Sequence, residues 1–92
     1  MKDIEVEVIF YGKVQRVGLR ANIQNRAEEL GVRGVARNLE DGCVEVIAQG
    51  ERVVLEKFVE KIKKGTPFSK IEEVEITWYD FVQDSMTEFS IE

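Results

Sequence analysis

The sequence predicts an α+β protein in which two helices cover one face of an antiparallel sheet. The chain has 92 residues, the length of one domain, and 43% of them are hydrophobic. Apolar residues alternate with polar ones in several short segments, as in half-buried strands, and recur every three or four residues in two others, as in helices. The two patterns interleave without a linker or an internal repeat, so we expect a single domain over residues 1–92.

The first strand and the first helix are predicted on either side of a loop that carries two glycines. Residues 4–10 alternate, and residues 12–18 break the alternation. The apolar residues that follow are spaced as on one face of a helix: Leu19, Ile23, Ala27 and Leu30. Gly31 suits the end of this helix, because glycine adopts the left-handed conformation of many helix C-termini.

A hairpin is predicted next. Residues 32–39 form a weaker strand pattern, and residues 43–48 alternate again. The pair Asp41-Gly42 between them is a frequent hairpin turn sequence. We therefore expect the second and third strands to pair with each other.

A second helix and two more strands complete the pattern. Apolar residues over 54–62 have helical spacing, and Gly65-Thr66-Pro67 ends that helix because proline cannot continue it. Residues 73–78 alternate as a fourth strand, and Phe89 and Ile91 indicate a short fifth strand.

This order, β-α-β-β-α-β plus a short C-terminal strand, is the pattern of a ferredoxin-like α/β sandwich, with core strand order 4-1-3-2 and the last strand at an edge. The first and second strands run parallel with the third between them, so their C-terminal ends lie roughly 10 Å apart at one end of the sheet. We expect the loop after the first strand and Asn38, near the end of the second, to line one small site.

Composition restricts the chemistry of that site. The chain has no histidine and a net charge of −5, which argues against nucleic acid as a partner. The single cysteine, Cys43, excludes an internal disulfide, and no apolar stretch approaches membrane-spanning length. We expect a cytoplasmic monomer with no cofactor, metal or membrane contact.

The loop before the first helix is a candidate anion site. Main-chain N–H groups at a helix N-terminus are free to bind anions, and the helix dipole adds partial positive charge there. Arg20 lies on the first helical turn, where a cation opposes the dipole, so a bound anion would explain it; a solvated surface arginine is the alternative. Phosphate fits the planar fork of arginine.

The stretch Gly12-Lys13-Val14-Gln15-Arg16-Val17-Gly18-Leu19-Arg20 resembles the signature of the acylphosphatase family, G-(R/K)-V-Q-G-V-x-F-R. The resemblance continues through Asn38 and Asp41-Gly42 to the turn at Gly65 and Pro67. It implies metal-free hydrolysis of a small acyl phosphate to a carboxylate and inorganic phosphate, by direct attack of water on phosphorus. It also implies that inorganic phosphate or sulfate binds as a ligand.

The resemblance assigns roles by position. Arg20 matches the phosphate-binding arginine of the family, and Asn38 matches the asparagine that orients the attacking water. The main-chain N–H groups of the loop match the phosphate cradle: Gln15, Arg16, Val17, Gly18 and Leu19. A carboxylate leaving group, with a pKa of about 4, departs without a general acid, so this chemistry does not need histidine.

Arg16 departs from the signature, because the family usually has glycine there. A loop glycine often serves a positive φ or a close approach of the main chain to a ligand. Arg16 either distorts the cradle, leaving a weakened or non-catalytic anion-binding domain, or fits it and adds positive charge for the substrate.

A third interpretation is an RNA-binding module of the same strand and helix order. Such modules stack bases on aromatic residues of the first and third strands. Here the outward positions of these strands are acidic or aliphatic: Glu5, Glu7, Ile9, Glu45 and Ile47. The sequence therefore disfavours RNA as a ligand.

Overall fold

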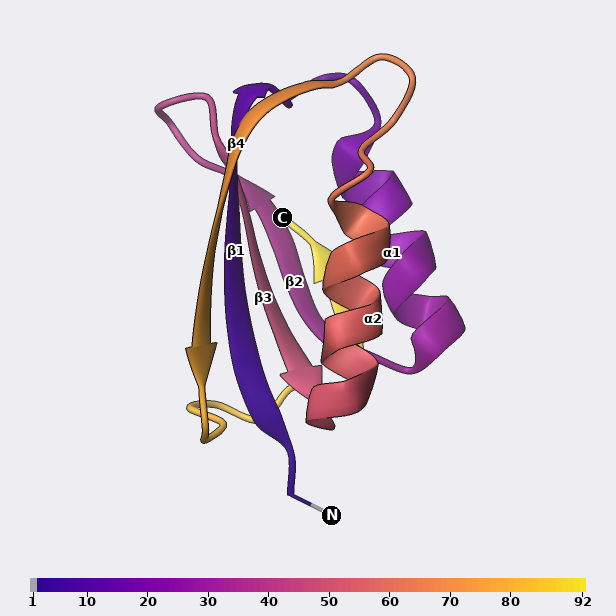
Figure 1. The fold of residues 1–92 in the computed structure, drawn as a ribbon, viewed down its shortest axis with the longest axis vertical. Helices are drawn as coiled ribbons and strands as arrows, with labels where there is room; N and C mark the ends of the chain where they lie inside the picture. The colour runs from indigo at the N-terminus through magenta and orange to yellow at the C-terminus, as the bar shows by residue number, and fades with distance from the viewer. Residues whose placement is uncertain (1) are drawn as a thin grey trace.

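Two helices lie side by side on one face of a five-stranded sheet (Figure 1). The computed structural model describes residues 2–92. The elements in chain order are β1 (Ile4–Lys13), α1 (Leu19–Leu30), β2 (Arg33–Asn38), β3 (Val44–Gly50), α2 (Arg52–Ile62), β4 (Lys70–Tyr79) and β5 (Phe89–Ile91). The ferredoxin-like fold predicted from the pattern of apolar residues is confirmed.

The strand order is β4-β1-β3-β2-β5, which is the predicted core order with β5 at an edge. The four core strands are antiparallel to their neighbours, whereas β5 pairs parallel to β2. The sheet is therefore mixed, and the prediction of a fully antiparallel sheet is wrong for this strand. After β4 the chain crosses the end of the sheet and returns alongside β2, so β5 runs in the direction of β2 (Figure 1).

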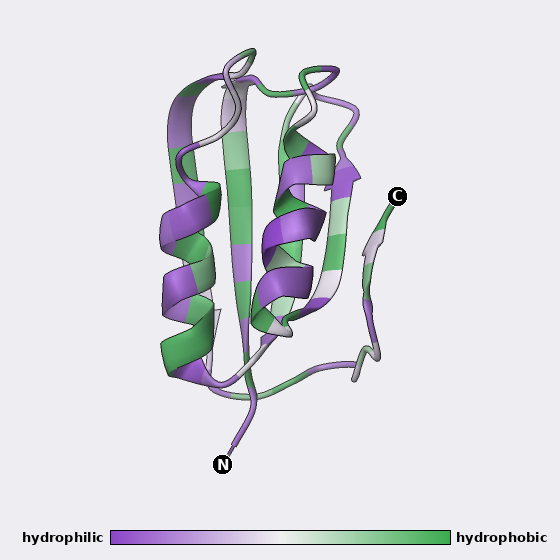
Figure 2. Cartoon of the chain, turned by 90° about the vertical axis from the view of Figure 1, so that its right-hand side faces the viewer, coloured by the Kyte–Doolittle hydropathy of each residue, from purple (hydrophilic) through white to green (hydrophobic). Residues whose placement is uncertain are grey.

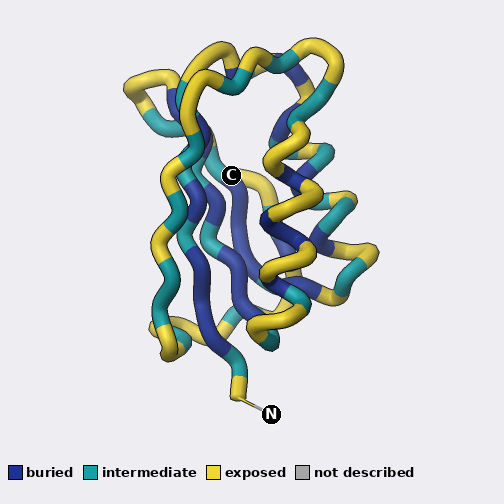
Figure 3. Tube along the Cα trace, in the orientation of Figure 1, coloured by how far each residue is buried: buried dark blue, intermediate teal, exposed yellow. Residues whose placement is uncertain are grey.

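The core lies between the sheet and the two helices, whose outer sides are polar (Figure 2). The inward sides of the strands and helices are buried and the outer helix sides are exposed (Figure 3). The alternating apolar residues of β1 all lie in this core: Ile4, Val6, Val8 and Phe10. Within residues 2–92, neither helix is long and apolar enough to cross a membrane.

Strand β1 runs further than its alternation predicted. It continues through Gly12 and Lys13, which were expected in the loop, by way of a bulge between Tyr11 and Gly12. Gly12 has a φ of 120°, and a Cβ atom there would lie 2.3 Å from the carbonyl oxygen of Lys70. The strand therefore needs glycine at this position to pass close to β4, and the loop shortens to residues 14–18.

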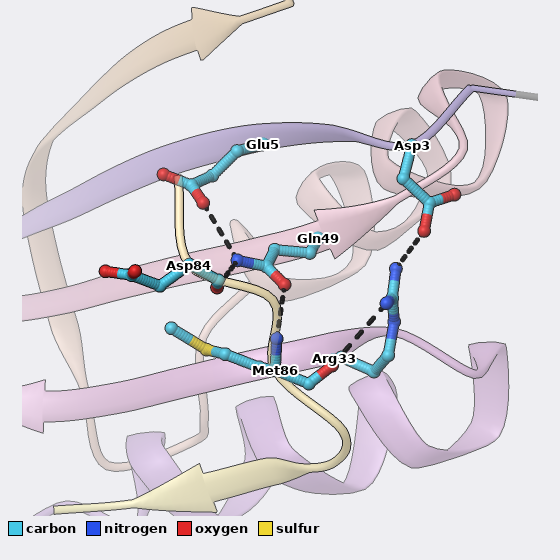
Figure 4. Close-up of polar contacts among 6 residues, drawn as sticks. All are labelled: Asp3, Glu5, Arg33, Gln49, Asp84 and Met86. Atoms are coloured by element: carbon cyan, nitrogen blue, oxygen red, sulfur yellow. Dashed lines mark hydrogen bonds and ion pairs between the residues drawn. The ribbon is translucent and has the colours of Figure 1, made fainter. Parts of the chain in front are cut away.

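A buried amide holds the segment between β4 and β5 across the open face of the sheet (Figure 4). Gln49 is fully buried, and its Nε2 donates to Glu5 Oε1 at 2.9 Å and to the carbonyl oxygen of Asp84 at 2.6 Å. Its Oε1 accepts from the N–H of Met86 at 2.9 Å. Glu5 was expected on a solvated face but is only 7% exposed, because this segment covers it.

Replacement of Gln49 by leucine tests this interaction. The variant keeps a similar volume but removes this partner from the buried Glu5 and from the partly buried N–H of Met86. We therefore expect the free energy of unfolding in urea to fall by about 2–4 kcal/mol. Gln83→Leu, an exposed glutamine in the same segment, is the control and should change it by less than about 0.5 kcal/mol. Equal effects of the two substitutions would show that Gln49 does not hold the segment.

Candidate functional site

Three loops meet at one end of the molecule, the upper end in Figure 1. They connect β1 to α1, β2 to β3, and α2 to β4. The first of them enters α1 through Gly18, which has a φ of 78°. In the described part of the chain, no side chain caps this helix N-terminus and its first turn holds no acidic residue. The free N–H groups and the positive end of the dipole are thus available to an anion.

A cavity of about 160 Å³ opens beside this helix N-terminus, several times the roughly 30 Å³ that one water molecule occupies. It is lined by Val14, Arg16, Gly18, Leu19, Arg20, Ala21 and Ile91. Four of the predicted site residues line it, whereas Gln15, Val17 and Asn38 do not. Its apolar lining residues come from the loop, α1 and β5, and the arginines supply its charge.

The side chain of Arg20 is half-buried and forms a hydrogen bond to a main-chain oxygen. Its Nη1 donates to the main-chain oxygen of Glu92, the residue that follows β5. Glu92 in turn donates its N–H to the carbonyl oxygen of Ala36 at 2.9 Å. The guanidinium therefore has a main-chain oxygen acceptor beside the cavity.

Asn38 is the last residue of β2 and is exposed. Side chains alternate along a strand, so Asn38 lies on the same face as Ala36, which is fully buried against the helices. Asn38 thus faces the layer that contains α1, as the predicted topology required, at the same end of the sheet as the loop.

The side chain of Gln15 joins the loop to the turn that follows Asn38. Its Nε2 donates to the carbonyl oxygen of Leu39 at 2.8 Å and to that of Cys43 at 2.9 Å. Sequence reasoning missed this contact, because it assigned only the main chain of Gln15 to the site. No local pattern signals the contact, because its partners are main-chain groups 24 and 28 residues away.

Thr66 makes a second connection to the loop. Its Oγ1 donates to the carbonyl oxygen of Val17 at 2.8 Å and accepts from the N–H of Phe68 at 3.3 Å. The sequence predicted only that the segment around Thr66 ends α2. The loop is thus held from two sides, by the β2–β3 turn and by the α2–β4 loop.

Comparisons with known proteins identify the family of the chain. The family model described as acylphosphatase matches residues 6–91. The acylphosphatase of Thermus thermophilus is 48% identical over 67 residues, which is 73% of this chain and 76% of that protein. The acylphosphatase of Bacillus subtilis is 38% identical over 74 residues, which is 80% of this chain and 81% of that protein.

The chain belongs to the acylphosphatase family. A crystal structure of an acylphosphatase from Bacillus subtilis has the same fold, with a TM-score of 0.90 and 35% identity over 96% of this chain and 97% of that one. The matched portion therefore includes nearly the whole of both chains.

Against the acylphosphatase signature, Arg16 occupies the glycine position with the conformation that glycine would adopt. Its φ is 63°, and no other described residue except glycine has a positive φ. Such a conformation costs a non-glycine residue about 1–2 kcal/mol. Arg16 is exposed and lines the cavity.

Cys43 immediately precedes β3 but has the wrong environment for a nucleophile in this acylphosphatase-family site. It is 6% exposed, and burial, together with the Asp41 carboxylate, raises the pKa of its thiol. Asp41 accepts from the N–H of Cys43 at 3.1 Å, and this bond lowers the pKa of Asp41. Asp41 thus serves the turn, as predicted. Residues 2–92 contain no cluster of three or more carboxylate, thiol or imidazole groups placed to hold a metal ion.

Arg16→Gly should stabilise the protein. Glycine removes the left-handed strain, and part of that gain is offset by the greater freedom of the unfolded chain, so we expect a net increase of about 0.5–1 kcal/mol in urea unfolding. Arg16→Ala is the matched control, since it removes the side chain but keeps the strain, and should give no such increase. A gain of the same size in both variants would assign the effect to charge instead of to the main chain.

Proposed function

We propose that this chain hydrolyses acyl phosphates to a carboxylate and inorganic phosphate at the loop that precedes α1. The observation that carries the proposal is the convergence of Arg20, the uncapped N-terminus of α1 and a small cavity, in a member of the acylphosphatase family. Each of these features favours a doubly negative phosphoryl group.

In this proposal the phosphoryl oxygens accept from the main-chain N–H groups of residues 15–19, and the Arg20 guanidinium binds two of them side by side. The substrate displaces the main-chain oxygen of Glu92 from Arg20. Inorganic phosphate and sulfate should occupy the same place as ligands, because they present the same oxygens.

The chemical step needs little acid or base catalysis. Asn38 orients a water molecule whose oxygen attacks phosphorus, and the bond from phosphorus to the acyl oxygen breaks. The carboxylate leaves with the bond electrons, and the proton of the water passes to a phosphoryl oxygen. Catalysis then consists of positioning the water and of stabilising the charge on the transferring group, which together supply most of the rate enhancement in enzymatic phosphoryl transfer.

The overall charge and the edge strand favour a small-molecule substrate and a monomer, and we propose a cytoplasmic location. The chain is acidic overall, which disfavours nucleic acid. Its free long edge strand, β4, carries Lys70, Glu72 and Glu73, and such charges oppose pairing with another sheet.

The alternative is an anion-binding domain in which Arg16 has abolished turnover. The φ of 63° at Arg16 argues against it, because the main chain keeps the left-handed path suited to glycine. Arg16→Gly should therefore change kcat/KM for benzoyl phosphate by less than about tenfold. A rise of about a hundredfold or more would favour the alternative.

Replacement of the two proposed catalytic residues gives the direct test. Arg20→Ala and Asn38→Ala should each lower kcat/KM for benzoyl phosphate by about a hundredfold or more, as for the loss of one group that stabilises a transition state. Arg26→Ala replaces a partly exposed arginine further along α1 that pairs with Glu29 at 3.2 Å; it is the control and should retain activity. Absence of turnover by the folded wild-type protein would refute the proposed function.

A further inference from the structure

We propose that the side chain of Gln15 is a positioning residue that fixes the anion-binding loop relative to Asn38. It thereby sets the distance from the bound phosphoryl group to the attacking water. This inference rests on the proposed function. The signature uses only the main-chain N–H of Gln15, and the inference adds a role for its side chain.

The contact uses the full donor capacity of the amide. The side-chain NH₂ group of Gln15 has two hydrogens, and its nitrogen lies 2.8 and 2.9 Å from the two carbonyl oxygens of Leu39 and Cys43. These carbonyls belong to the two ends of one turn. The half-buried side chain of Gln15 forms hydrogen bonds to both ends of the turn. It therefore restrains both the distance between the loop and the turn and the orientation of one relative to the other.

The turn does not need Gln15 in order to form. The N–H of Leu39 donates to the carbonyl oxygen of Cys43 at 2.9 Å, and the N–H of Gly42 donates to that of Leu39 at 3.1 Å. Each carbonyl thus keeps a main-chain partner when the glutamine amide is removed. The contribution of Gln15 lies in joining two loops that both form without it, so a variant should still fold.

The connection leads directly to Asn38. Leu39 is the next residue along the chain, and Asn38 pairs with Val44 at the end of the β2–β3 ladder. The other connection to the loop, from Thr66 to Val17, comes from the α2–β4 loop, on a different part of the chain from this turn. Of the two, only the Gln15 contact relates the cradle to the residue proposed to hold the water.

A double-mutant cycle on kcat separates positioning from a general structural effect. Gln15→Ala should lower kcat for benzoyl phosphate by about 10- to 100-fold and change KM by less than about threefold, because the cradle still binds phosphate. In an Asn38→Ala background the same substitution should lower kcat by less than about twofold, since its effect acts through Asn38.

Two further variants serve as controls in the cycle. Thr66→Val removes the other loop connection and should have the same effect on kcat with and without Asn38. Gln83→Ala, an exposed glutamine between β4 and β5, should leave kcat unchanged. Full additivity of Gln15→Ala with Asn38→Ala, or a loss confined to KM, would overturn the positioning role.

A phosphate-binding experiment tests the positioning role of Gln15 without relying on turnover. Inorganic phosphate titrated into the labelled wild-type protein should shift both the loop amide resonances and the Asn38 side-chain NH₂ resonance in NMR spectra. In Gln15→Ala the loop resonances should still shift, and the Asn38 shift should be lost. Phosphate binding with this pattern but without hydrolysis would refute the proposed function and support the positioning role of Gln15. An unchanged Asn38 shift in the variant would refute the positioning role. No shifts at all in the wild-type protein would refute both.

Discussion

The passage from β1 into α1 within residues 14–18 is the constraint on which the site depends. So short a connection between a strand and a helix that packs back on the same sheet requires left-handed main chain, found at residues 16 and 18. The same turn directs N–H groups outward at the helix start and brings Arg20 to the first helical turn. The anion-binding features are thus consequences of the main-chain path between β1 and α1.

Charge is distributed unevenly between the β1–α1 loop and the rest of the protein. The chain carries a net charge of −5, yet the cavity is lined by Arg16 and Arg20 and the first turn of α1 has no acid. Carboxylates gather on the open face of the sheet instead. There, burial and the neighbouring carboxylates Glu45, Glu75 and Glu5 raise the pKa of Glu7. The separation leaves a local positive field for an anionic substrate on a protein that repels anions elsewhere.

The elements that short-range patterns determine were predictable from the sequence. Alternation and helical spacing located the strands and helices, and topology alone placed Asn38 at the same end of the sheet as the loop. The extension of β1 was missed because a bulge at Gly12 interrupts alternation without ending the strand. The parallel pairing of β5 was missed because it depends on the path of the chain between β4 and β5. The burial of Glu5 was missed because it depends on Gln49 and on that same distant segment. The Gln15 contact escaped for the same reason, since its partners are main-chain carbonyls that no side-chain pattern reveals.

The central claim is that water attacks phosphorus at this loop, and the fate of the oxygen atoms tests it most directly. Hydrolysis of benzoyl phosphate by the wild-type protein in ¹⁸O-labelled water, followed by mass spectrometry of both products, distinguishes the bond that breaks. The proposed mechanism predicts one labelled oxygen in the inorganic phosphate and none in the benzoate. Label in the benzoate would show attack at the acyl carbon and would contradict the account.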